Sequence, residues 1–142
     1  MAIVDSACIH WLEKKGLRPN KIDKYVIDTI ENNKFCIILN SENILIARSY
    51  ALYLLYWVTR AENANNNAVV LAYNYDQGLL VKKELLKFCN KIGLKIDSDT
   101  VKTIKFNNGC SLSIYRIHKN IAAKEEINIC FCMDMSEVRS HE

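Results

Sequence analysis

Short apolar runs of strand length alternate with helical segments along this chain, and this alternation constrains the fold most strongly. The runs FCIIL, AVVLAY and INICFCM occupy residues 35–39, 68–73 and 127–133. Between them, the apolar periodicity predicts a long buried helix over residues 44–60 and an amphipathic helix over residues 76–92. Strands that are apolar at nearly every position are typical of a parallel sheet covered by helices. The sequence therefore predicts an α/β fold with a mostly parallel sheet.

The other segments add an N-terminal helical region and a hairpin. Asn20 is placed to cap a helix that follows it. Two β-rich runs, residues 100–106 and 110–117, flank an Asn-Asn-Gly turn and predict an antiparallel hairpin. We expect one domain over residues 1–142, in which residues 1–20 form an N-terminal helix and a candidate appendage.

The composition argues against several classes of protein. The most apolar segment, residues 44–58, contains Arg48 and is shorter than the ~20 residues that cross a bilayer. Cys130 and Cys132 are separated by a single residue, which is not the Cys-x2-Cys spacing of a zinc site. The N-terminus lacks a signal-peptide pattern. We therefore expect a cytoplasmic protein with reduced thiols, no metal and no membrane partner. A net charge of +3 does not by itself indicate nucleic-acid binding.

The segment after the first predicted strand has the layout of a phosphate-binding loop. Such a loop joins a buried strand to a buried helix and needs glycines for close backbone approach, a Lys for the phosphates and a Ser or Thr for Mg²⁺. In this chain the turn and the helix start read Ser41, Glu42, Asn43, Ile44, Leu45, Ile46, Ala47, Arg48 and Ser49. The layout is present, but the glycines and the Lys are absent.

The order of the segments resembles the N-terminal ATPase domain of the phage terminase large subunit, the motor that packages DNA. KFCIILNS is similar to the strand entering that family's loop, SYALYLLYW to the helix leaving it, and AVVLAYNYDQ to the second strand. FNNGCSL is similar to the family's hairpin and ICFCMD to its Walker B strand, so the resemblance spans residues 22–134. It implies a P-loop NTPase-like fold of the RecA or terminase type, with flanking helices and an antiparallel hairpin, truncated after the Walker B strand.

The departures from the family pattern concern the ATP site. Aligned without gaps, Leu45, Ile46 and Ala47 take the places of the family's Gly, Lys and Thr. A two-residue insertion instead places Ala47, Arg48 and Ser49 there and restores a positive charge and a hydroxyl. Arg is not equivalent to the compact ammonium of Lys, however. We favour the alignment without gaps because it keeps the following helix aligned with the helix that follows the loop in the family.

One further departure concerns the catalytic Glu and one concerns the adenine side, whereas the Walker B aspartate has a match. Asp134 matches the Walker B aspartate, which binds Mg²⁺ through water in the family, or it simply ends the strand. Met135 stands where the catalytic Glu is expected, and Asp23 stands near the family's adenine-side Gln. Phosphoryl transfer is catalysed by positioning and charge stabilisation, so the resemblance implies no hydrolysis. We expect no enzyme activity, no catalytic residue and no cofactor.

Two sets of side chains on predicted helices are candidates for an interaction face. The aromatic spacing in the apolar helix suits either a partner surface or core packing, and the lysines of the amphipathic helix suit either a partner, DNA or a solvated face. The candidate residues are Tyr50, Tyr53, Trp57, Lys82, Lys83 and Lys87.

The resemblance implies an inactive mimic of the packaging ATPase, encoded by a phage or a phage satellite. Such a protein is expected to bind the large terminase or another packaging component and to inhibit or redirect genome packaging. The alternatives are a weak ATP-binding protein that uses Arg48, Ser49 and Asp134, a basic nucleic-acid-binding phage protein, and an inhibitor of a host or defence enzyme. Fold alone does not distinguish among them.

Overall fold

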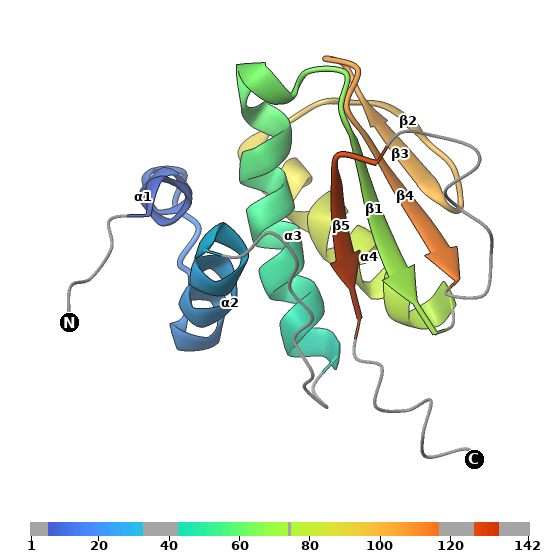
Figure 1. Ribbon diagram of the computed structural model, residues 1–142. Coiled ribbons are helices and arrows are strands. Elements are labelled where there is room, and N and C mark those ends of the chain that lie inside the picture. Colours follow the sequence, from blue (N-terminus) through green and yellow to red (C-terminus); the bar gives the residue numbers. More distant parts are fainter. Residues whose placement is uncertain (1–5, 33–42, 74, 117–126, 134–142) are drawn as a thin grey trace, which may run out of the picture.

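In the described part of the chain, five strands form one mixed sheet, and the helices α3 (Asn43–Thr59) and α4 (Tyr75–Ile92) pack against one of its faces (Figure 1). The computed structural model describes residues 6–32, 43–73, 75–116 and 127–133. The α/β fold class predicted from the sequence is confirmed. The run at residues 35–39, predicted as the first strand, lies outside the described residues.

The strands are β1 (Asn67–Ala72), β2 (Ile96–Asp99), β3 (Thr103–Phe106), β4 (Ser111–Arg116) and β5 (Ile129–Cys132). Their order across the sheet is β2-β3-β4-β1-β5. β1 is parallel to both β4 and β5, whereas β3 is antiparallel to β4 and to β2. The predicted parallel pairing and the predicted hairpin are therefore both present.

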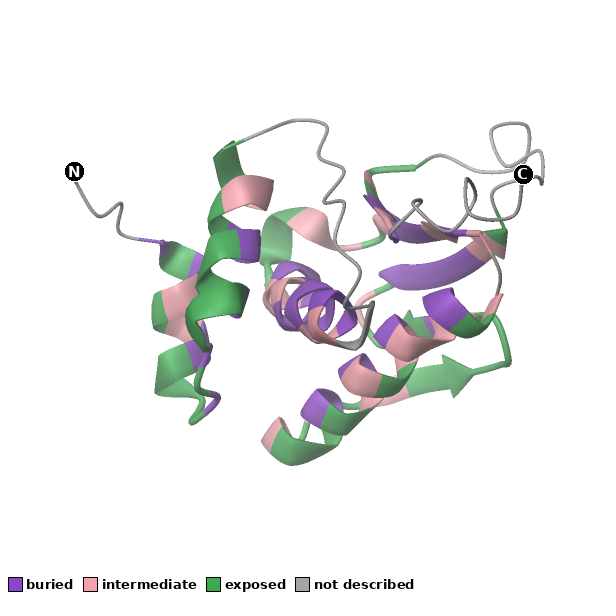
Figure 2. Ribbon diagram, turned by 90° about the horizontal axis from the view of Figure 1, so that it is seen from below, coloured by how far each residue is buried: buried purple, intermediate pink, exposed green. Residues whose placement is uncertain are grey.

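The helices are α1 (Ala7–Lys14), α2 (Lys21–Asn32), α3 (Asn43–Thr59) and α4 (Tyr75–Ile92), with a 3₁₀ turn η1 (Ala61–Asn63) after α3. Side chains of α3 and α4 form the core together with alternate residues of the central strands, such as Val70, Ile114 and Phe131. Figure 2 shows α3 end-on, with buried residues around most of its circumference. This burial is the reason for the nearly uninterrupted apolar sequence of α3.

The N-terminal helix belongs to the same core as the rest of the chain. Cys8 and Leu12 of α1 are fully buried, and Leu17 in the following turn is 2% exposed. All three belong to the core cluster that contains α3. The described part of the N-terminal segment, residues 6–20, therefore contributes to the same core as α3.

Asparagine side chains bind the loops at the end of the sheet where the parallel strands begin. The Asn63 and Asn108 amides donate to the carbonyls of Trp57 and Val58, at 2.9 and 2.8 Å, and so satisfy two carbonyls at the C-terminal end of α3. The backbone N–H of Asn67 donates to Asn128 Oδ1 at 2.8 Å, which joins the starts of β1 and β5. These bonds fix where α3 ends and where the parallel strands start.

Gly78 sets the distance between α4 and the sheet. A Cβ added at this position would overlap Cγ2 of Ile114 in β4 and would also contact Cβ of Ala72 in β1. Gly78 and Ile114 are both buried, so the Ile114 side chain has little space into which to move. The close packing of α4 on the sheet therefore requires a residue without a side chain.

Gly78→Ala is expected to destabilise the protein by about 1–3 kcal/mol, because overpacking of a filled core exceeds the gain of about 1 kcal/mol in helix propensity. Thermal unfolding followed by circular dichroism measures the effect. The control is Lys83→Ala, an exposed position on the same helix, which should leave the melting temperature within about 2 °C of the parent. A rise in melting temperature for Gly78→Ala would show that the contact with Ile114 is not tight.

Candidate functional site

The carboxylate of Asp23 is buried between α2 and α3. Asp23 is 1% exposed and lies on the same side of α2 as Val26 and Ile27, which are fully buried. Its Oδ2 accepts from the backbone N–H of Asn20 at 2.9 Å, and Asn20 Oδ1 accepts from the backbone N–H of Asp23 at 2.8 Å. This reciprocal pair is a capping box that fixes the start of α2.

Two side chains of α3 complete the surroundings of the Asp23 carboxylate. The Arg48 guanidinium forms an ion pair with Asp23 Oδ2 through Nη1. The Ser49 hydroxyl, which is fully buried, lies 2.6 Å from Asp23 Oδ1 and 3.2 Å from the Leu45 carbonyl. Both oxygens of the buried carboxylate are thus hydrogen-bonded, as burial of a charge requires. We refer to Asp23, Arg48 and Ser49 as the Asp23 cluster.

Arg48 also contacts α4. Its guanidinium carbon lies 5.7 Å from the ring centroid of Phe88, within the range of a cation–π interaction. The Arg48 side chain is 29% exposed, so only part of it is open to solvent. One cation of α3 therefore links α2, through a carboxylate, to α4, through an aromatic ring.

The remaining positions of the loop-like segment have a structural role where they are described. Leu45 is half-buried, and Ile46 and Ala47 are 1% and 0% exposed in the core. The Ile46 side chain, which aligns with the phosphate-binding Lys in the alignment without gaps, packs in the core. Ser41 and Glu42 lie outside the described residues, and Asn43 is the first residue of α3.

The end of the Walker B-like strand is described only in part. The backbone N–H of Met133 donates to the Leu71 carbonyl at 2.9 Å, which continues the pairing of β5 with β1. Asp134 lies outside the described residues. Across the described ranges, no group of three or more His, Cys, Asp or Glu side chains is arranged to hold a metal ion.

Tyr50 and Trp57 of α3 pack into the core, so these two do not form the interaction face considered above. Tyr50 is 1% exposed, its ring lies 4.9 Å from that of Phe131, and its hydroxyl donates to the Cys132 carbonyl at 2.7 Å. Trp57 is 8% exposed. Tyr53 is half-buried, and burial raises its pKa to about 12. These side chains attach α3 to β5 and to the core.

The three candidate lysines of α4 are not equivalent. The ammonium of Lys82 lies 2.7 Å from Asp99 Oδ1 and donates to the Thr100 carbonyl at 2.6 Å, and its side chain is only 13% exposed. Lys82 therefore holds the β2–β3 turn, and it also lines the depression on α4 described below. Lys83 is exposed, and Lys87, 64% exposed, pairs with Glu84 at 3.2 Å. These two lysines border a shallow depression of about 510 Å³ on α4 that also includes Leu79 and Leu86.

Cys130 and Cys132 lie on the same face of β5 because strand side chains alternate. Cys130 is exposed and Cys132 half-buried. A hydrogen bond between the two thiols lowers the pKa of Cys132 and, together with burial, raises the pKa of Cys130.

The sequence contained a signal for the Asp23 cluster. Asp23 stands three and four positions before Val26 and Ile27, so it lies on the apolar stripe of its helix, and Arg48 interrupts the otherwise apolar α3. A carboxylate and a cation on two apolar faces indicate mutual pairing. The periodicity alone did not indicate which two helices face each other.

Asp23→Ala is expected to cost about 3 kcal/mol of unfolding free energy, because it leaves Arg48 without its partner and removes the capping box. In a double-mutant cycle with Arg48→Met, the coupling energy between the two side chains should exceed about 1 kcal/mol. Urea denaturation measures both quantities. The control is Asp28→Ala, an exposed carboxylate on the same helix, for which a change within about 0.5 kcal/mol is expected. Equal costs for the two substitutions would contradict the importance of the cluster.

Of the helices in the described ranges, none combines the length and the apolar content that crossing a membrane requires. No protein-family model and no curated protein sequence matches this chain. What is established is a mixed α/β fold with the Asp23 cluster between α2 and α3.

Proposed function

We propose that this protein is a non-hydrolysing, terminase-like P-loop fold that acts by binding the DNA-packaging motor. The proposal combines the ordered motifs of the sequence with one structural observation. That observation is the engagement of Arg48 and Ser49 by Asp23. Arg48 and Ser49 are the residues that the rival alignment assigns to phosphate and Mg²⁺, and a carboxylate already binds both.

The arrangement of elements supports a P-loop-like fold. The second strand and the Walker B-like strand of the resemblance are β1 and β5, which are parallel neighbours. The long apolar helix α3 and the amphipathic helix α4 pack on one face of this sheet, as crossover helices do in α/β proteins. The hairpin of the resemblance is β3 and β4.

The start of α3 supports the alignment without gaps. In a P-loop the Gly-Lys-Thr segment opens the helix. Because α3 begins at Asn43, residues 45–47 are its third to fifth residues, and Arg48 and Ser49 follow them. In this alignment Leu45, Ile46 and Ala47 replace the phosphate-binding residues, and two of the three are buried in the core. The helix start then presents apolar side chains where the family binds phosphate.

Weak ATP binding through Arg48 and Ser49 is less well supported. A phosphate would have to compete with Asp23 for the Arg48 guanidinium and would lie next to a buried negative charge. Breaking a buried pair by removing one partner costs about 3–5 kcal/mol. We therefore infer that the protein neither binds nor hydrolyses ATP, and that it acts through its surface.

The surface that fits a protein partner is the outer face of α4. The depression there is bordered by Leu79, Leu86, Lys83 and Lys87, an apolar centre with cations at its edge. Interfaces commonly have an apolar core and a polar rim. A protein that resembles a motor subunit is expected to dock where a neighbouring subunit would dock, and so to inhibit or redirect packaging. Inhibition of a host or defence enzyme through the same face remains the second candidate.

Pull-down of the tagged protein from phage-infected cells, with mass spectrometry, tests the proposal. We expect the large terminase or another packaging component to co-purify, and genome packaging to fall when the protein is expressed. Lys83→Glu combined with Lys87→Glu should weaken capture at least tenfold, whereas the matched reversal Lys14→Glu with Lys21→Glu on α1 and α2 should not. Purification of a host enzyme with no packaging protein would refute the motor-binding function.

Titration calorimetry with ATP and Mg²⁺ tests the inferred absence of nucleotide binding separately. We expect no heat of binding at millimolar nucleotide. A saturable heat that disappears in Arg48→Met would instead support the weak ATP-binding alternative.

A further inference from the structure

Residues 13–25, which include the turn between α1 and α2, expose more positive than negative charge. The five cations of this segment are all exposed: Lys14, Lys15, Arg18, Lys21 and Lys24. Of the two carboxylates over residues 13–25, only Glu13 is exposed, because Asp23 is buried and paired with Arg48. The whole chain has a net charge of only +3. Among the described residues, this segment therefore carries five exposed cations against one exposed carboxylate, and the next exposed carboxylates along α2 are Asp28 and Glu31.

These cations are largely available for a ligand. Within the part of the chain that the structure describes, Lys14, Arg18 and Lys21 form no ion pair. Lys24 lies 4.0 Å from Glu13 Oε2, with both side chains 50% exposed. Such exposed pairs contribute about 0–1 kcal/mol and exchange readily for another anion. The Asp23 cluster contributes indirectly, because it removes the other carboxylate of this segment from the surface.

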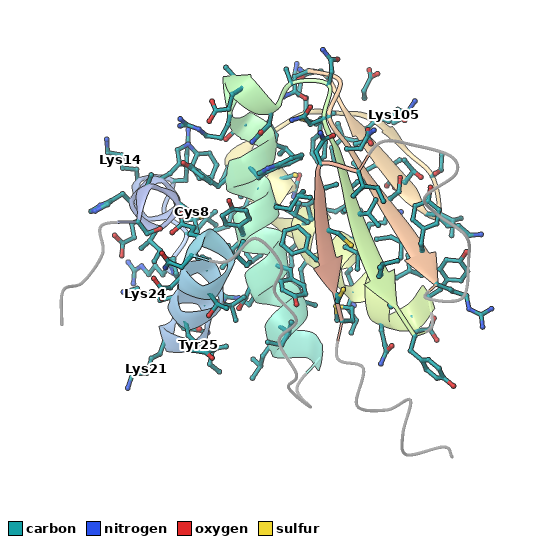
Figure 3. All side chains as sticks on the ribbon, in the orientation of Figure 1. Cys8, Lys14, Lys21, Lys24, Tyr25 and Lys105 are labelled. Carbon is teal, nitrogen blue, oxygen red and sulfur yellow. The ribbon has the colours of Figure 1, made fainter. Side chains whose placement is uncertain are left out.

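An exposed aromatic ring accompanies the cations. Tyr25 is 66% exposed, lies one helical turn after Lys21 and is next to Lys24 in sequence. Figure 3 shows Lys14, Lys24, Lys21 and Tyr25 on α1 and α2, on the flank of the molecule away from the sheet. Elsewhere on this segment, the ammonium of Lys15 lies 5.5 Å from the ring centroid of Trp11. We refer to Lys14, Lys15, Arg18, Lys21, Lys24 and Tyr25 as the basic ridge.

We propose that the basic ridge binds single-stranded nucleic acid, with its cations on successive phosphates and the Tyr25 ring stacked on a base. Basic grooves or patches interleaved with aromatic rings are typical of proteins that bind single strands, because every base has a face to stack. Lysine is depleted at the core of protein–protein interfaces, which disfavours an acidic protein as the ligand. A duplex would engage the cations but leave Tyr25 without a base to stack on. This inference is independent of the motor-binding function.

Fluorescence anisotropy with a labelled 20-nucleotide oligo(dT), measured over a series of salt concentrations, tests the inference. We expect binding at low salt that weakens as salt increases. Lys14→Gln combined with Lys21→Gln and Lys24→Gln should reduce the slope of log affinity against log salt by about 2, or roughly 0.7 for each lost contact. Tyr25→Ala should reduce affinity roughly five- to hundredfold and leave the slope unchanged.

The matched control replaces three lysines of α4, as Lys83→Gln with Lys87→Gln and Lys91→Gln, and should bind like the parent. All substituted side chains are exposed, and thermal unfolding checks that each variant is folded. Binding of a single-stranded RNA of the same length supports the inference equally. The inference is overturned if the protein does not bind the oligonucleotide at 50 mM salt, or if the α4 control loses as much affinity as the triple lysine variant. It is also overturned if Tyr25→Ala leaves the affinity unchanged, or if polyglutamate at equal charge concentration displaces the oligonucleotide.

Discussion

The pairing of one buried carboxylate with a cation and a hydroxyl connects most features of this protein. Asp23 caps α2 through Asn20, binds α3 through Arg48 and Ser49, and reaches α4 through the contact of Arg48 with Phe88. A buried charge is tolerated only when its oxygens are hydrogen-bonded and its charge is compensated. The positions of α2, α3 and α4 relative to one another are therefore coupled to a single ionised group.

The same pairing affects what the molecule can bind. It occupies the Arg and Ser that would otherwise be the best phosphate ligands on α3, while Ile46 and Ala47 fill the core at the helix start. It also removes a carboxylate from the α1–α2 surface, where exposed cations and Tyr25 then predominate. Binding to a partner is thus expected at outer faces, on α4 and on the basic ridge.

Periodicity predicted the elements of this fold better than their contacts. The alternation of apolar runs and helical segments correctly predicted β1, β5, the hairpin and the two long helices, because those patterns reflect burial. It missed β2, whose sequence Ile-Asp-Ser-Asp is mostly polar and exposed since it is the last strand on its side of the described sheet. The spacing of the aromatic residues in α3 was compatible with a surface face or with core packing. The contact of Tyr50 with Phe131 shows that Tyr50 belongs to the core. The Asp23 cluster depends on which helices meet, which local sequence does not encode.

The central claim is that the Arg48 guanidinium is bound to Asp23 and is not a nucleotide site. The most direct measurement is the ¹⁵N–¹H resonance of the Arg48 side chain, assigned with Arg48→Lys and followed by NMR during titration with ATP and Mg²⁺. The account predicts that the resonance moves in Asp23→Asn and stays unchanged up to millimolar nucleotide. A saturable shift on addition of nucleotide, with no response to Asp23→Asn, would contradict it.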